Sequence, residues 1–357
     1  EMWTRNNREA KQKAEKPLET LGRTAGAIAA SLSINMVGGI VKSALKAVSA
    51  PSTFRRATAT RLQTIWVDAI VWLLPPQLFH LSGDVPKPAN LRRSSRHSKR
   101  HSTSSRRSSR RRSLPSEKVT RIFLMNSACE ADVIYMMFVA KALEDAQGNV
   151  KAFLSLRERV ALLGLGSLFE LFGFTFLSRR SKEDREMKDR KNVARHYRAL
   201  HADRAYEWSL IFPERGWATK DAIQEQRLEE PGRPELDTLL LPDANELIAA
   251  LEALEDKQVE IYDVTIAYEG YSDEVADNER ELYKNRLVPS YRNLLSASAS
   301  TDIHMNIVRF DPKDVLLHPG GTAGWLDERW QMKDHKLKHF SLYTAFPPEN
   351  EEEVITR

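Results

Sequence analysis

Residues that could bind an anion or move a proton follow three apolar runs of this sequence. Asn126 and Ser127 come after "VTRIFLM", Arg179 and Arg180 end "FTFLSRR", and Glu214 ends "WSLIFPE". Arginine binds phosphate through paired hydrogen bonds, and a carboxylate can accept a proton or a hydroxyl hydrogen bond. These residues predict a polar site if the three runs form neighbouring strands.

Two of these residue groups have a second interpretation. The apolar run 210–212 stops at Pro213, as a buried strand does where it enters a loop. Glu214 is then either a site carboxylate or part of a solvated turn. Arg179 and Arg180 are either ligands for a phosphate or lipid head group, or cations that merely end a strand.

Strands and helices are predicted to alternate along the chain. Apolar runs predict strands at 119–125, 150–156, 174–180, 208–212, 260–270 and 303–310, and helical spacing predicts helices at 129–146, 157–173, 181–204, 243–257 and 324–343. This alternation predicts an α/β fold with a mostly parallel sheet flanked by helices. Because the carboxyl ends of parallel strands share one edge, we expect Asn126, Arg179, Arg180 and Glu214 to meet there.

The positive charge of the chain is concentrated in one segment. Residues 92–113 contain ten Lys or Arg and no acid, so this segment carries a charge of +10. Because the formal net charge of the whole chain is +5, the remainder carries −5. The overall basicity therefore does not indicate a nucleic-acid-binding fold. The segment lacks apolar residues and is predicted to be disordered. It could bind anionic lipid head groups, be switched by phosphorylation, contact RNA, or be a solvated insertion.

Two weakly apolar segments precede this tract. Residues 24–41 are uncharged and rich in Ala, Gly and Ser, while 62–79 carries Trp66 and Trp72 but is interrupted by Asp68 and two prolines. They fit a single short membrane span, helices lying in the membrane interface, or a soluble segment.

The chain is predicted to divide into four parts. These are membrane-associated helices in 1–80, a disordered Arg/Ser-rich insertion in 86–116, an α/β domain in 117–347 and an acidic tail in 348–357. The single cysteine, Cys129, excludes an intramolecular disulfide and any multi-cysteine metal site.

Several blocks, in this order, resemble the glycerophospholipid acyltransferases, in particular the 1-acylglycerol-3-phosphate and lysocardiolipin acyltransferases. "NSACEAD" (126–132) resembles the family's Asn-His-x4-Asp block, "FTFLSRR" its Phe-x-Phe-Leu/Ile-Ser-Arg block, and "FPERG" its Phe-Pro-Glu-Gly-Thr block. Stretches 79–87, 262–270 and 325–347 resemble the strand before the first block, the strand before the fourth block and the C-terminal helix. The resemblance covers residues 60–347 apart from the insertion.

This resemblance implies a membrane-bound enzyme that transfers a fatty acyl group from acyl-CoA to a lysophospholipid without a bound cofactor or metal. A histidine would take the proton of the attacking hydroxyl, and an aspartate, at Asp132, would orient it. The substrate-binding positions implied are Asn126, Arg179, Arg180, Glu214, Arg215 and Gly216. The resemblance also implies an endomembrane, such as the endoplasmic reticulum, or a mitochondrial membrane, with the site on the cytosolic face.

Three site blocks depart from the family pattern. Ser127 occupies the histidine position, and losing a positioned general base costs about 10²–10⁴-fold in rate. Arg215 and Gly216 replace a glycine and a threonine, and Asp243 in "LLLPDAN" replaces an arginine. The chain is therefore either an acyltransferase with a weakened or rearranged site, or a catalytically inactive lipid-binding or scaffold relative.

Other titratable residues offer few replacements for the missing base. Glu130 could serve if it is buried, although an acid in the first turn of a helix is common. His196 and His201 are predicted to be solvated on a charged helix, and Cys129 to be a small buried residue.

Overall fold

The computed structural model describes residues 33, 36, 39–40, 51–73, 77–86, 119–129, 131–143, 149–154, 166–177, 182–203, 205–254, 259–278 and 302–348. The Arg/Ser tract, Glu130, Arg179, Arg180, most of segment 24–41 and nearly all of the acidic tail lie outside these residues.

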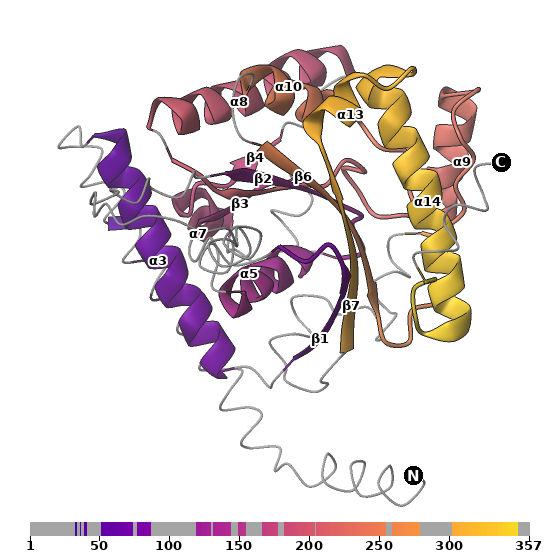
Figure 1. Ribbon diagram of the computed structural model, residues 1–357, viewed down its shortest axis with the longest axis horizontal. Coiled ribbons are helices and arrows are strands. Elements are labelled where there is room, and N and C mark those ends of the chain that lie inside the picture. Colours follow the sequence, from indigo (N-terminus) through magenta and orange to yellow (C-terminus); the bar gives the residue numbers. More distant parts are fainter. Residues whose placement is uncertain are drawn as a thin grey trace, which may run out of the picture.

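A seven-stranded sheet forms the centre of the described chain, in the order β1-β7-β6-β2-β5-β3-β4 (Figure 1). The strands are β1 (Leu78–Gly83), β2 (Thr120–Met125), β3 (Val150–Leu154), β4 (Thr175–Phe176), β5 (Trp208–Ile211), β6 (Val259–Tyr268) and β7 (Asp302–Phe310). Strands β6 to β4 of this order all run parallel, whereas β7 is antiparallel to β6 and pairs in parallel with β1. The prediction of an α/β fold with a mostly parallel sheet is confirmed.

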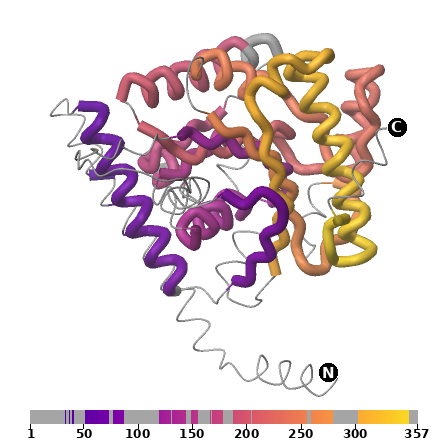
Figure 2. The backbone as a smooth tube through the Cα atoms, viewed as in Figure 1, coloured from indigo at the N-terminus to yellow at the C-terminus, as the bar shows by residue number. Residues whose placement is uncertain are grey.

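Helices cover both faces of the sheet (Figures 1 and 2). One face packs against α3 (Ser52–Leu73), α5 (Asp132–Ala142) and α7 (Gly166–Leu171). The other packs against α8 (Lys182–Ala202), α10 (Asn245–Ala253), α13 (Pro312–Leu316) and α14 (Gly321–Tyr343).

Strand β2 lies inside the sheet because its sequence can be buried on both sides. All six of its residues are buried. Phe123 and Met125 join the core beneath α5, whereas Ile122 and Leu124 join the core beneath α8 and α14. Since successive side chains of a strand point to opposite faces, an uninterrupted apolar run specifies a strand covered on both faces.

Two helices were not predicted from the sequence because they bury little apolar surface. Helix α9 (Lys220–Glu229) buries only Ile223 and begins at Thr219, whose side chain accepts the N–H of Ala222 at 3.2 Å. Helix α13 is five residues long and is capped by Asp311. In both helices the sequence signal is the capping residue at the N-terminus, because neither helix has a regular spacing of apolar residues.

The segment that was predicted to lie at a membrane interface belongs to α3, and part of it is buried. Trp66, Val67 and Ile70 lie in the core, and the Trp66 ring contacts Phe169 edge-on at 5.7 Å. Trp66 is therefore a core residue, whereas Trp72 is 83% exposed. The membrane association of this segment stays a prediction. None of the described helices is long and apolar enough to cross a bilayer.

The α/β unit also includes elements that come before residue 117. Helix α3 packs on the core, and β1 is an edge strand of the same sheet, although the sequence had placed both outside the 117–347 domain. The edge position of β1 explains why its short run, with exposed Leu78 and His80, gave only a weak strand signal.

Replacing Trp66 with alanine is expected to lower the free energy of unfolding by about 3–5 kcal/mol, because it leaves a large cavity between α3 and α7. Trp72→Ala is the matched control and should change it by less than about 0.5 kcal/mol. Chemical denaturation of both variants measures the difference. Equal effects would contradict the packing of α3 described above.

Candidate functional site

The carboxyl ends of β2, β5 and β6 meet at one edge of the sheet, as predicted for Asn126 and Glu214. A cavity of about 370 Å³ lies at this edge. Its walls include Asn126, Ser127, Trp217, Lys220, Tyr268 and Tyr271. We call it the strand-end cavity. Cavities at such strand ends are the usual ligand sites of open α/β sheets.

Asn126 extends the pairing of β2 with β6 beyond the last strand residue. Its side-chain amide donates to the carbonyl of Ile266 at 3.1 Å, and its oxygen accepts the N–H of Ile266 at 2.8 Å. Asn126 is almost fully buried. Its amide is used to hold the two strands together, so its role here is to position the cavity wall.

Asp132 organises the turn between β2 and α5. One carboxylate oxygen accepts the backbone N–H groups of Ala128 at 2.9 Å and Cys129 at 3.0 Å. The other accepts the hydroxyl of Tyr268 and the thiol of Cys129, the latter at 3.3 Å. The carboxylate is fully buried, so these bonds offset the cost of removing its charge from water. Cys129 is buried, as predicted.

Ser127 sits between this turn and the loop after β5. Its backbone N–H donates to Glu214 Oε1 at 3.2 Å, and Ser127 also lines the strand-end cavity. No histidine is among the described residues that line this cavity. The titratable group that is hydrogen bonded to Ser127 is the carboxyl of Glu214.

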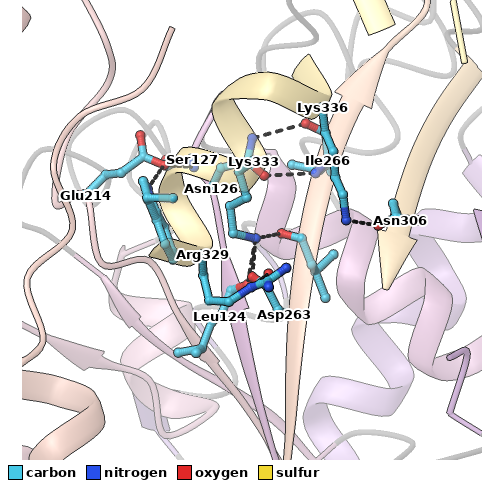
Figure 3. Close-up of polar contacts among 12 residues, drawn as sticks. Leu124, Asn126, Ser127, Glu214, Asp263, Ile266, Asn306, Arg329, Lys333 and Lys336 are labelled. Atoms are coloured by element: carbon cyan, nitrogen blue, oxygen red, sulfur yellow. Dashed lines mark hydrogen bonds and ion pairs between the residues drawn. The ribbon is translucent and has the colours of Figure 1, made fainter. Parts of the chain in front are cut away.

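Glu214 is buried, which excludes its interpretation as a solvated turn residue. Its Oε1 accepts the N–H of Ser127 and the indole N–H of Trp330, each at 3.2 Å (Figure 3). Burial raises the pKa of Glu214 to about 8, and the neighbouring N–H groups of Ser127, Trp330 and Leu240 oppose this rise only in part. The carboxyl is therefore poised to titrate near neutral pH.

A buried ion pair supports the site from below. Lys333 on α14 lies 2.5 Å from Asp263 on β6 and donates to the carbonyl oxygens of Val264 and Leu124 at 2.5 and 3.3 Å (Figure 3). Burial lowers the pKa of Lys333 to about 8, against the attraction of Asp263. Arg329, one turn earlier, donates to Asp263 at 3.1 Å. These bonds fix α14, and with it Trp330, against the strand ends.

Arg215 turns away from the strand-end cavity. Its φ of 54° lies in the left-handed region that favours glycine, the residue expected at this position from the family resemblance. Its guanidinium binds Glu246 and lies 3.2 Å from Asp243 and 4.0 Å from Asp189. The arginine at the glycine position thus pairs with the aspartate at the expected arginine position.

The remaining predicted residues fall into two groups. Gly216 lies in the loop after β5, where an added Cβ would come within 3.5 Å of Leu240. Arg179 and Arg180 lie outside the described residues, as does Glu130, so their predicted roles stay predictions.

The prediction that His196 is solvated is wrong. Its Nε2 lies 2.5 Å from Glu207, and its ring packs edge-on against Phe153 at 5.3 Å. Glu207, the residue before β5, is fully buried, and a partly buried imidazole on α8 pairs with its carboxylate. His201 is exposed, as predicted.

Three residues of the site were not predicted from the sequence: Tyr268, Trp330 and Lys333. Tyr268 ends a buried strand, where a tyrosine hydroxyl commonly finds a polar partner, and this signal could have been used. Trp330 and Lys333 are three residues apart on a helix with many charges, and their spacing alone does not reveal which face is buried.

Comparisons with known proteins find similarity to lipid acyltransferases. It is 26% identical over 234 residues to the probable 1-acyl-sn-glycerol-3-phosphate acyltransferase 5 of Arabidopsis thaliana, covering 65% of this chain and 56% of that protein. It is 27% identical over 247 residues to the mouse 1-acyl-sn-glycerol-3-phosphate acyltransferase epsilon, covering 66% and 61%. The zebrafish lysocardiolipin acyltransferase 1 is 23% identical over 181 residues, covering 50% of this chain and 42% of that protein.

No family profile matches the chain. The crystal structure of the acyltransferase PlsC of Thermotoga maritima aligns with a TM-score of 0.40 and 11% identity, covering 90% of this chain and 98% of that one. This score is too low to support an argument.

The chain is similar to named members of the glycerophospholipid acyltransferase family, which supports the resemblance seen in its sequence blocks. The relatives that it matches are named as 1-acylglycerol-3-phosphate and lysocardiolipin acyltransferases, and it spans about two fifths to three fifths of their lengths.

The raised pKa of Glu214 predicts a pH-dependent stability. Between the ordinary value of 4.5 and about 8, the folded chain holds this proton more tightly than the unfolded chain. The free energy of unfolding therefore falls as pH rises through this window. Glu214→Gln should make the slope of the free energy of unfolding against pH less negative by up to about 1.4 kcal/mol per pH unit.

Denaturation of wild type and Glu214→Gln at half-unit steps from pH 4.5 to 8.5 measures this slope. Glu229→Gln, which removes an exposed carboxyl from α9, is the control for a general loss of charge. Parallel curves for wild type and Glu214→Gln would show that Glu214 does not titrate in this range.

Proposed function

We propose that this chain binds a lysophospholipid in the strand-end cavity and has lost the base-catalysed acyl transfer of its family. The observation that carries the proposal is the combination of Ser127 with the fully engaged carboxylate of Asp132. In acyl transfer, the lysophospholipid hydroxyl attacks the thioester carbonyl of acyl-CoA, its proton goes to a base, and the CoA thiolate leaves and is protonated. Here the position of that base holds a serine.

The bonds of Asp132 explain why the turn survives without a histidine. The carboxylate is held by Ala128, Cys129 and Tyr268, so the first turn of α5 keeps its shape whatever occupies position 127. The ligand cavity can therefore keep its shape without a proton acceptor at position 127. The volume of about 370 Å³ and the mixture of apolar and hydroxyl-bearing walls suit a lipid backbone and its polar groups.

Slow acyl transfer with Glu214 as the base is a second candidate function. The observation that favours it is that the buried carboxyl, whose pKa is raised to about 8, is hydrogen bonded to the backbone of Ser127. A general base works best when its pKa is near the working pH. The acyl donor proposed for this reaction is acyl-CoA.

CoA release from oleoyl-CoA, measured across a panel of lysophospholipids, tests the two candidates. We expect wild type to release no CoA above background. Ser127→His should raise the rate by about 10²-fold or more, since a positioned base contributes about 10²–10⁴-fold. Adding Asp132→Asn to Ser127→His should remove this gain. Ser272→His, which places a histidine elsewhere on the cavity wall, is the matched control and should stay silent.

Wild-type turnover would overturn the proposed loss of activity. If Glu214→Gln then abolished that turnover while lysophospholipid binding persisted, Glu214 would be the base. Calorimetric titration with a lysophospholipid reports binding separately from turnover, and wild type that binds none would overturn the proposal as a whole.

We also propose that α3 contacts the membrane that supplies this ligand. Phe54, Ile65 and Trp72 are 57%, 50% and 83% exposed and are spaced by 11 and 7 residues, which places them on one side of the helix. Tryptophan favours the membrane interface, and the basic tract 92–113 would add attraction to anionic lipids.

Trp72→Ala is expected to weaken binding of the full chain to vesicles of phosphatidylcholine and phosphatidylserine by about tenfold, as burial of a large apolar side chain contributes about 1.5–3 kcal/mol. Vesicle sedimentation measures the bound fraction. Leu228→Ala, at a 77% exposed leucine on α9, is the control. Equal losses in both variants would argue against a specific role for α3.

A further inference from the structure

A second and larger cavity, of about 890 Å³, lies beside the loop that follows β5. It is bounded by that loop, by α9 and by the N-terminal ends of α10 and α14. Six carboxyl groups line it, those of Glu214, Glu225, Glu229, Glu230, Asp243 and Asp327. We call this cavity the acidic groove.

The two arginines of the acidic groove are already engaged by acids. Arg215 binds Glu246 and Asp243, as described above. Arg233 lies 2.5 Å from both Glu230 and Asp327 and also donates to the carbonyl of Pro242 at 2.8 Å. Each arginine carries one positive charge and pairs with at least two acids. The six carboxyl groups of the groove therefore outnumber its two arginines, and the groove carries an excess of negative charge.

One buried carboxyl oxygen at the groove adds an independent sign of a ligand. Glu214 lines the groove and is only 4% exposed, and its Oε2 is buried without a hydrogen-bond partner. A buried carboxyl oxygen rarely stays without a partner, since the cost is about 1–3 kcal/mol. A donor that enters the groove beside Glu214 would satisfy this oxygen.

The acidic groove adjoins the strand-end cavity through a shared wall. Ser127 lines the strand-end cavity and Glu214 lines the groove, and the two residues are hydrogen bonded at 3.2 Å. The neighbouring residues Leu239 and Leu240 divide in the same way, one lining each cavity. A ligand that places its glycerol near Ser127 would thus have its head group close to the groove.

We propose that the acidic groove receives the positively charged amine of a lysophospholipid head group, so that the chain favours lysolipids ending in an ammonium group over lysophosphatidic acid. The inference rests on the proposed lysophospholipid binding and deepens it. A terminal phosphate would meet Asp243 and the flanking glutamates, and like charges in contact cost affinity. An ammonium group would instead complete the charge balance of the groove and donate to its carboxyl oxygens.

Calorimetric titration of the full chain with two lysolipids that share one short acyl chain tests this inference. One lysolipid ends in phosphoethanolamine and the other in a phosphate monoester, both below their micelle concentration. We expect the ethanolamine lipid to bind about tenfold more tightly or better, as expected for complementary against like charge. Raising the salt concentration should reduce the difference.

Two variants locate the selectivity in the groove. Asp243→Asn keeps an acceptor for the N–H of Asn245, which Asp243 caps at 2.8 Å, but removes the charge. Glu225→Gln combined with Glu229→Gln changes only exposed side chains of α9 and so should not disturb folding. Each change should reduce the preference for the ethanolamine lysolipid over the phosphate monoester by about threefold or more. This matches the free energy that a partly exposed charge pair contributes. Glu252→Gln, an exposed acid on α10 outside the groove, is the matched control.

The outcomes separate this inference from the proposal on which it rests. Equal binding of the two lysolipids, or preference for the phosphate monoester, would overturn the amine assignment while leaving lysophospholipid binding intact. Absence of binding by either would overturn both. Binding of free ethanolamine as tightly as the lysolipid would show that the groove takes a small amine and not a lipid head group, and would overturn the lipid assignment.

Discussion

The buried carboxylate of Asp132 is the interaction on which the site depends. It gathers two backbone N–H groups of its own turn and the hydroxyl of Tyr268, and so joins the end of β2, the start of α5 and the end of β6. None of these bonds requires a histidine at position 127. A charge buried without such partners would cost several kcal/mol, so the turn and the carboxylate stabilise each other. This mutual need explains how the turn between β2 and α5 keeps its shape with a serine at position 127.

The parts of the fold that follow from local sequence could be predicted, and the parts set by distant contacts could not. Strands β2, β5 and β6 are mostly apolar and almost wholly buried, and their parallel arrangement brings Asn126 and Glu214 to one edge. The direction of Arg215 depends on Asp189 and Glu246, which come from two other helices. The burial of His196 likewise depends on Glu207, a residue of the loop before β5. No local pattern around either residue encodes the position of its partner.

Glu214 and Arg215 show how one peptide unit separates two environments. The left-handed conformation of Arg215 sends its side chain to the acids around α10, while Glu214 stays beneath Ser127 and Trp330. Such a conformation costs a non-glycine residue about 1–2 kcal/mol, which the ion pairs of Arg215 can offset. The loop can thus keep a site carboxyl in place while carrying a bulky cation where close backbone approach would favour glycine.

The pairing of β1 with β7 has a consequence for how the chain is made. Residues 78–83 pair with residues 302–307, which lie 224 positions further along the chain. During synthesis β1 leaves the ribosome long before its partner exists, so its backbone donors and acceptors wait unpaired. Contacts so far apart in sequence also form slowly. Completion of this sheet therefore awaits the synthesis of β7, and until then the edge strand β1 is open to pairing with other chains.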